Sequence, residues 1–127
     1  MRLLLDTHIF LWCIKSDRKL SKAARTKISD AYEVYVSSAS IWEITIKIKL
    51  KKLDADINLI LESISKSGFL ELPITAQHAV AVASLPDLHR DPFDRILIAQ
   101  AISEPLTFLT VDAQLKHYSD LVDLINY

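Results

Sequence analysis

Short apolar segments alternate along this chain with longer segments in which apolar residues recur at helical spacing. The apolar segments predict buried strands at residues 2–5, 33–36, 69–72, 106–109 and 121–125. The periodic segments predict helices at residues 9–14, 20–31, 57–68, 75–84, 92–103 and 112–117. Because buried strands alternate with helices, the pattern predicts an α/β fold: a three-layer α/β/α sandwich with a mainly parallel central sheet.

One stretch after the second predicted strand fits two structures. Residues 44–50 alternate apolar and polar side chains and are rich in isoleucine, which favours a strand. Ser40 and Glu43, just before them, have the spacing of a capping box, which favours the start of a helix. Local sequence rules leave both interpretations open.

Composition predicts one globular domain over residues 1–127. Hydrophobic residues make up 50% of the chain and charged residues 24%, and one glycine and four prolines leave little room for a linker. The single cysteine, Cys13, lies in an apolar stretch, so we expect a buried thiol. Asp6 interrupts the apolar start of the chain, and no segment is long and apolar enough to span a membrane. We therefore expect a cytoplasmic protein.

Charge is nearly balanced overall but unevenly distributed. The formal net charge is −1, yet basic residues gather at positions 18, 19, 22, 25 and 27 and at positions 47, 49, 51 and 52. Arg90 and Arg95 flank the acidic pair Asp91 and Asp94. A basic rim around an acidic centre suits an anionic polymer held beside a metal ion. The alternative for these lysines and arginines is a solvated helix surface.

Four acidic residues come just after apolar stretches, at predicted strand ends or helix starts: Asp6, Glu43, Asp94 and Asp112. In a parallel sheet, ligands bind beyond the carboxyl ends of the strands, so the fold can gather these acids there. Gathered carboxylates repel one another and raise at least one pKa among them unless a divalent cation lies between them. The pattern therefore predicts a Mg²⁺ or Mn²⁺ site for phosphate chemistry.

Each acid also has a purely structural explanation. Asp6 and Asp112 can cap the helices that follow them, and Glu43 can complete the capping box. Asp91 can cap a helix that starts at Pro92, and Asp94 then falls at the third helical position, where its charge favours the positive end of the helix. A protein whose acids are only caps would be a binding module without catalysis. The sequence disfavours a phosphorylation receiver domain, which also gathers acids around Mg²⁺. The first strand ends in a single aspartate, the third ends in Leu72 and Pro73, and no lysine suits the position after the last strand.

The four acids lie in motifs that resemble the PIN-domain family, and in particular the small VapC-like toxin ribonucleases of type II toxin–antitoxin pairs. The motifs are LLLDTH around Asp6, SASIWEI with its following lysines around Glu43, HRDPFDRILIAQ around Asp94, and LTVD ending at Asp112. The resemblance runs over nearly the whole chain. It implies a parallel sheet flanked by helices, and a helix rather than a strand over residues 39–50.

The resemblance also implies a function. The family's acidic site maps onto Asp6, Glu43, Asp94 and Asp112, which would bind Mg²⁺ or Mn²⁺ and activate water for the hydrolysis of RNA. Supporting residues would be Thr7, Ser38, Asp91, Arg95 and Thr110. The implied partners are a small antitoxin protein, a homodimer mate and an RNA substrate such as a tRNA, rRNA or mRNA. A DNA- or flap-directed nuclease is the alternative, since the same acids act on any phosphodiester.

The histidines and the aromatic candidates have simpler explanations than metal or base binding. The histidines, at positions 8, 78, 89 and 117, lack the spacing of zinc ligands. We expect a structural role for His8. Trp12, Trp42 and Phe93 can stack on bases, but packing in the core or in an interface is the expected role.

Overall fold

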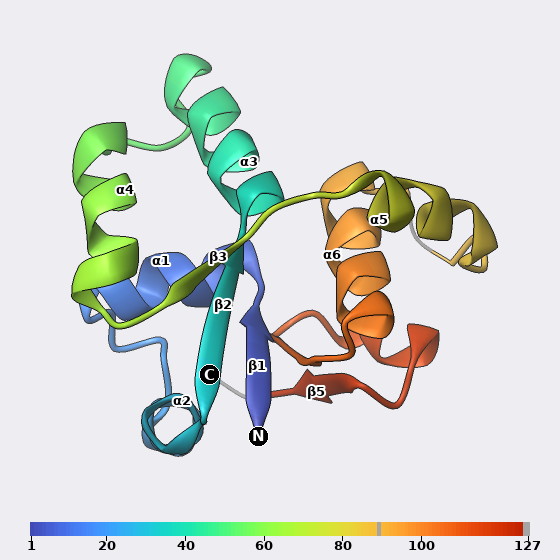
Figure 1. The fold of residues 1–127 in the computed structure, drawn as a ribbon. Coiled ribbons are helices and arrows are strands. Elements are labelled where there is room, and N and C mark those ends of the chain that lie inside the picture. Colours follow the sequence, from blue (N-terminus) through green and yellow to red (C-terminus); the bar gives the residue numbers. More distant parts are fainter. Residues whose placement is uncertain (89, 126–127) are drawn as a thin grey trace.

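The computed structural model describes residues 1–88 and 90–125. His89, the first residue of the motif around Asp94, lies outside the described residues. Five parallel strands form one sheet in the order β3-β2-β1-β4-β5 (Figure 1). Their bounds are Arg2–Leu5 (β1), Glu33–Ser37 (β2), Leu70–Leu72 (β3), Thr107–Thr110 (β4) and Val122–Leu124 (β5). In the central register, Leu4 lies opposite Tyr35 on β2 and Phe108 on β4.

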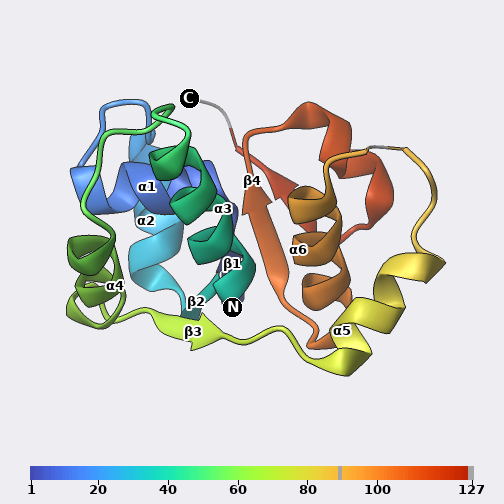
Figure 2. The same cartoon turned by 90° about the horizontal axis from the view of Figure 1, so that it is seen from above.

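Helices cover both faces of this sheet, which confirms the predicted sandwich (Figure 2). Their bounds are Thr7–Lys15 (α1), Lys22–Asp30 (α2), Ser38–Lys49 (α3), Ile57–Lys66 (α4), Ala76–Ala81 (α5) and Pro92–Ser103 (α6). Two 3₁₀ helices, Val82–Ser84 (η1) and Ala113–Tyr118 (η2), follow α5 and β4. None of the helices among the described residues is both long and apolar enough to cross a membrane.

Two apolar cores lie on opposite faces of the sheet because successive strand side chains point in opposite directions. Leu3 and Leu5 of β1 pack with residues of α1, α2, α3 and α4 in one core. Leu4 packs with residues of α6 and η2 in the other core. Because both faces are buried, β1 consists of consecutive leucines rather than an alternating pattern.

The stretch that local rules left open is helix α3, as the family resemblance implied. The predicted capping box is wrong: Ser37 caps α3, and its hydroxyl accepts the Ala39 N–H at 3.0 Å. Ser40 lies in the first turn of the helix, fully buried, and its Oγ accepts the Thr7 hydroxyl at 2.9 Å. The helix begins earlier than predicted because β2 ends in Ser37, whose side chain can turn the strand directly into the helix.

Other predicted helix ends are confirmed. Gly68 follows α4 with φ of 76°, the left-handed conformation in which a side chain is strained. Thr75 caps α5 and accepts the His78 N–H at 3.2 Å. Asp91 caps α6 immediately before Pro92. The thiol of Cys13 is half-buried against the core rather than fully buried, and burial raises its pKa to about 11.

Candidate functional site

Asp6 lies at the carboxyl end of β1 and is 4% exposed. Its Oδ1 caps α1 by accepting the Ile9 N–H at 2.8 Å. Its Oδ2 accepts the hydroxyl of Thr110 at 2.6 Å. Thr110 is the last residue of β4, the strand next to β1. The two strand ends therefore hold this carboxylate in one fixed orientation.

Burial raises the pKa of Asp6, because the low-dielectric surroundings disfavour its charged form. Bonds from Thr110 and Ile9 oppose this effect, as does the nearby His8. A raised pKa in the acidic group was predicted from the sequence, but the dominant cause is burial rather than repulsion between carboxylates. A bound cation would favour the charged form of Asp6.

Asp112 joins Asp6 at the same edge of the sheet. It caps η2, where its Oδ1 accepts the Gln114 N–H at 2.9 Å. Its own backbone N–H donates to Thr110 Oγ1 at 3.1 Å. The same threonine hydroxyl donates to Asp6, so it links the two acidic positions. Thr110 was among the supporting residues that the family resemblance implied.

Glu43 and Asp94 lie on α3 and α6, two helices that pack against each other beside β1 and β4 (Figure 2). Residues adjacent to the two acids touch directly: the rings of Trp42 and Phe93 meet edge-on, with centroids 5.2 Å apart. Glu43 is half-buried and forms an ion pair with Lys47 at 3.3 Å. Two neighbouring helices therefore carry the second pair of predicted acids.

The donor atoms of this region fit a hard divalent cation, because carboxylate and hydroxyl oxygens are the ligands that Mg²⁺ and Mn²⁺ prefer. Among residues 1–88 and 90–125, however, no three acidic, histidine or cysteine side chains lie close enough together to hold a metal ion. Mg²⁺ binds through one or two carboxylates and retains several waters. The arrangement therefore fits a cation held by few protein atoms and completed by water, rather than an all-protein cage.

Comparison with known proteins identifies the family. The model of the PIN domain matches residues 3–121, a range that includes all four acids. The chain belongs to the PIN domain family. It is also similar to Ribonuclease VapC22 of Mycobacterium tuberculosis, with 27% identity over 118 residues that span 91% of this chain and 90% of that protein.

Solved structures share the fold of this PIN domain. VapBC2 from Rickettsia felis, bound to a promoter DNA fragment, matches with a TM-score of 0.73 and 18% identity over 100% of this chain and 99% of that one. DNA-bound VapBC from Salmonella typhimurium has a TM-score of 0.67 and 15% identity over 98% and 97%. FitAcB from Neisseria gonorrhoeae has a TM-score of 0.66 and 19% identity over 98% and 96%. At these identities the likeness establishes the fold.

The supporting residues expected from the sequence occupy different places in this PIN domain. Thr7 bonds to Ser40 and so fastens the start of α1 to α3. Ser38 accepts the Ile74 N–H at 3.2 Å, which ties α3 to the segment before α5. Asp91 accepts the N–H groups of Phe93 and Asp94 at the start of α6. These contacts fix how the helices that carry Glu43 and Asp94 meet the strand ends.

The guanidinium of Arg95 contacts neighbouring segments of the chain instead of standing free at the rim of the site. It donates to the carbonyl oxygens of Pro86 at 2.9 Å and Val82 at 3.2 Å and to the Tyr118 hydroxyl at 3.3 Å. These bonds tie the start of α6 to the loop before it, to the start of η1 and to the end of η2. Arg90, by contrast, is exposed next to Asp91.

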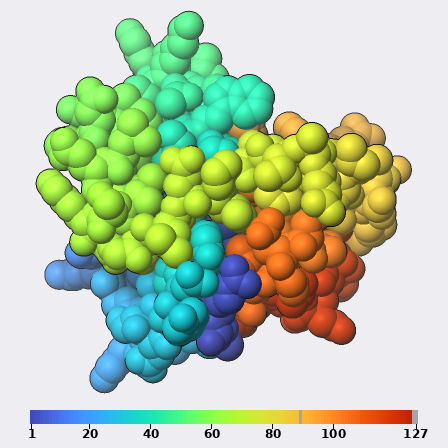
Figure 3. Space-filling view, in the orientation of Figure 1, coloured from blue at the N-terminus to red at the C-terminus, as the bar shows by residue number. Residues whose placement is uncertain are grey.

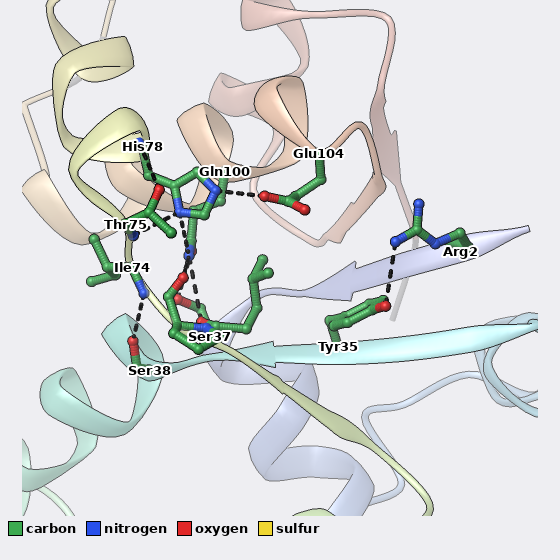
Figure 4. Close-up of polar contacts among 11 residues, drawn as sticks. Arg2, Tyr35, Ser37, Ser38, Ile74, Thr75, His78, Gln100 and Glu104 are labelled. Atoms are coloured by element: carbon green, nitrogen blue, oxygen red, sulfur yellow. Dashed lines mark hydrogen bonds and ion pairs between the residues drawn. The ribbon is translucent and has the colours of Figure 1, made fainter.

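A buried polar network that was not predicted from the sequence joins several segments of the PIN domain (Figure 4). The Ser37 hydroxyl donates to Gln100 Oε1 at 2.6 Å, and Gln100 Nε2 donates to the Pro73 carbonyl at 3.3 Å. His78 accepts the Thr75 N–H on Nδ1 and contacts Glu104 through Nε2 at 2.6 Å. The network joins the start of α3 to α5 and α6. A glutamine inside the apolar motif ILIAQA was the one available signal.

The raised pKa of Asp6 predicts a pH-dependent stability. The folded PIN domain binds a proton on the Asp6 carboxylate more tightly than the unfolded chain does. The free energy of unfolding should therefore fall as pH rises from 3.8, the ordinary pKa of this carboxyl group, through its raised pKa in the folded state. In EDTA, the Asp6→Asn variant should therefore gain stability over the wild type as pH increases through that window. Urea unfolding from pH 4 to pH 8 measures the difference.

Mn²⁺ should reverse that difference. At neutral pH the cation should stabilise the wild type, whose charged Asp6 it favours, and should leave Asp6→Asn nearly unchanged. Asp56→Asn is the matched control, because Asp56 also caps a helix but lies on α4. Parallel pH profiles for the wild type and Asp6→Asn, together with no response to Mn²⁺, would contradict this interpretation.

Proposed function

We propose that this PIN domain is a Mg²⁺- or Mn²⁺-dependent endoribonuclease that acts as the toxin of a toxin–antitoxin pair. The observation that carries the proposal is the buried carboxylate of Asp6, joined to Asp112 through Thr110 at the carboxyl edge of the sheet. Contact between α3 and α6, the helices that carry Glu43 and Asp94, supports their assignment to the same site. The similarity to a protein named Ribonuclease VapC22 supports RNA as the substrate.

Three of the acids have different proposed roles in binding the cation. Asp6 and Asp94 would hold it directly or through water, and Asp112 would contribute mainly through water. When bound, the cation lowers the pKa of a water molecule and offsets negative charge that develops on the phosphate oxygens. Thr110 keeps Asp6 oriented by donating to Oδ2, so the carboxylate needs no reorganisation when substrate arrives.

Glu43 binds the cation or orients the attacking water. Its ion pair with Lys47, one turn further along α3, restricts the position of its largely buried carboxylate. Water that attacks in line with the leaving oxygen gives a 5′-phosphate and a 3′-hydroxyl, with no covalent bond between enzyme and substrate. The reaction therefore needs positioned carboxylates and a cation, and it needs no nucleophilic side chain.

A second candidate is a binding module in which the acids serve only as caps. Asp6, Asp91 and Asp112 do cap α1, α6 and η2. Capping alone accounts for neither Glu43 nor Asp94, since neither is the capping residue of its helix. A cap also remains free to present its carboxylate to a cation, so the two roles are compatible.

The family resemblance and the shared fold suggest the partners of this protein. The solved structures that share the fold are of VapBC2, VapBC and FitAcB. We therefore propose a small cognate antitoxin that covers the acidic surface and keeps the nuclease inactive. A homodimer in the cytoplasm, acting on a tRNA, rRNA or mRNA, completes the proposal.

The nuclease proposal predicts metal-dependent cutting of RNA in preference to DNA. The purified chain, freed of any antitoxin, should cleave at least one member of a panel of structured and single-stranded RNAs in Mg²⁺ or Mn²⁺. The products should carry 5′-phosphates, which a 5′-phosphate-dependent exonuclease detects. DNA of the same sequence should stay intact, because the 2′-hydroxyl distinguishes the two polymers.

Each alternative has its own outcome in this experiment. Equal cleavage of the matched DNA would support the DNA- or flap-directed nuclease instead. A folded protein that cuts no RNA and gains no stability from Mn²⁺ would support the binding module.

A further inference from the structure

An apolar hollow of about 270 Å³ lies where α3 meets the start of α6. Its lining comes from three segments of the chain and consists of Ala39, Trp42, Ile74, Pro92, Phe93 and Ile96. Trp42 is 61% exposed although it contacts the ring of Phe93 edge-on. Figure 3 shows α3 and the segment from β3 to α5 side by side at this surface. An exposed indole beside a small apolar hollow is a ready stacking surface.

A second, charged hollow of about 460 Å³ adjoins the first. The two share Pro92 and Phe93 as a common wall. The second hollow is lined also by Glu43, Ile46, Lys47, Leu50, Lys52, Arg90 and Asp91. It therefore begins at a proposed catalytic acid and ends at basic side chains. Within the described part of the chain, Lys52 and Arg90 form no ion pair, so both cations are available to an external anion.

This combination matches the chemistry of a single unpaired nucleotide. Single-stranded nucleic acids bind where aromatic side chains stack on bases and cations follow the backbone. The apolar hollow offers an indole, a phenyl ring and a proline, while the neighbouring cations offer charge to phosphates. A base held inside a duplex cannot enter such a hollow, because its faces are already stacked on its neighbours.

We propose that the hollow around Trp42 and Phe93 receives an unpaired base adjacent to the scissile phosphodiester, and that Lys52 and Arg90 bind the phosphates flanking that base. This assignment rests on the proposed nuclease function, because Glu43 lines the charged hollow and marks the scissile position. It deepens that function by naming the side chains that would hold the nucleotide next to the cut.

Binding to the Asp6→Asn variant tests the subsite without cleavage. Fluorescence anisotropy with a labelled single-stranded oligoribonucleotide in Mg²⁺ gives the dissociation constant. Adding Trp42→Ala should weaken binding by about tenfold, since one base–aromatic stack is lost, and adding Trp42→Phe should restore most of the affinity. Tyr32→Ala is the matched control, because Tyr32 is an exposed aromatic residue that lines neither hollow.

Two further binding experiments distinguish the contribution of the base from that of the phosphate backbone. An abasic nucleotide next to the cleavage site should weaken the binding of RNA to the Asp6→Asn protein, which retains Trp42. The same abasic RNA should bind the protein that also carries Trp42→Ala as tightly as the intact RNA does. Lys52→Gln should lower the slope of log affinity against log salt by about one, as expected when one phosphate contact is lost.

The outcomes distinguish this proposal from the nuclease itself. If the wild type cleaves RNA while Trp42→Ala binds and cleaves equally well, the subsite is wrong and the nuclease stands. If no RNA is cut but binding still depends on Trp42, the subsite stands and the nuclease is wrong. If Trp42→Ala instead changes only the sedimentation of the protein, the hollow belongs to a protein contact and the proposal is overturned.

Discussion

Asp6→Asn and Asp94→Asn are each expected to reduce RNA cleavage by at least roughly 10³-fold while the fold persists. Asparagine has the size of aspartate and can still accept the Ile9 N–H at the start of α1, so the change removes charge and preserves the cap. At Asp94 the change removes charge from the first turn of α6. Initial rates on the cleaved RNA in Mg²⁺ measure the loss, and circular dichroism confirms the fold.

Asp56→Asn is the control for this prediction as well. Asp56 caps α4 and accepts the Asn58 N–H at 2.9 Å, so the substitution repeats the chemistry of an aspartate cap away from the proposed site. It should leave cleavage unchanged. Wild-type rates from either Asp6→Asn or Asp94→Asn would mean that the acids are not catalytic and that capping is their main role.

Gln100→Leu is expected to destabilise the protein by about 3 kcal/mol. Gln100 is fully buried on α6, and leucine would leave the hydroxyl of Ser37 and the carbonyl of Pro73 without their partner. A buried polar group without a hydrogen bond costs on the order of 1–3 kcal/mol. Urea unfolding at neutral pH, with a common slope for both proteins, gives the change in the free energy of unfolding.

Gln77→Leu provides the matched comparison, because Gln77 lies on α5 and is exposed. It should change stability by less than about 0.5 kcal/mol. The network also holds the start of α3 against α6, so Gln100→Leu should slow cleavage even at temperatures where the variant stays folded. A destabilisation no larger than that of Gln77→Leu would show that the network contributes little.

Most of the fold follows from local features of the sequence. Consecutive leucines in β1 predict a strand buried on both faces, and Asp91 with Pro92 predicts where α6 begins. Gly68 marks the end of α4 because it adopts a positive φ. The start of α3 could not be predicted locally. Ser37 and Ser40 are both good caps, and only the length of β2 decides between them.

The candidate site can be predicted only in part from the sequence. The spacing of the acids after strands and at helix starts indicates the edge of the sheet where Asp6 and Asp112 lie. The link between them through Thr110 depends on β4 pairing with β1, a contact between residues more than one hundred positions apart. The partners of Gln100 come from other segments for the same reason, so no local pattern identifies them.

The most direct test of the central claim is metal-dependent cleavage by a single preparation of the purified chain. RNA from the responsive panel is incubated with the protein in Mg²⁺, then with excess EDTA, then with Mg²⁺ restored, and Asp6→Asn is assayed in parallel. The account predicts cutting that stops in EDTA, resumes with Mg²⁺ and is absent from the variant at every step. Cutting that persists in EDTA, or that Asp6→Asn performs equally well, would contradict it.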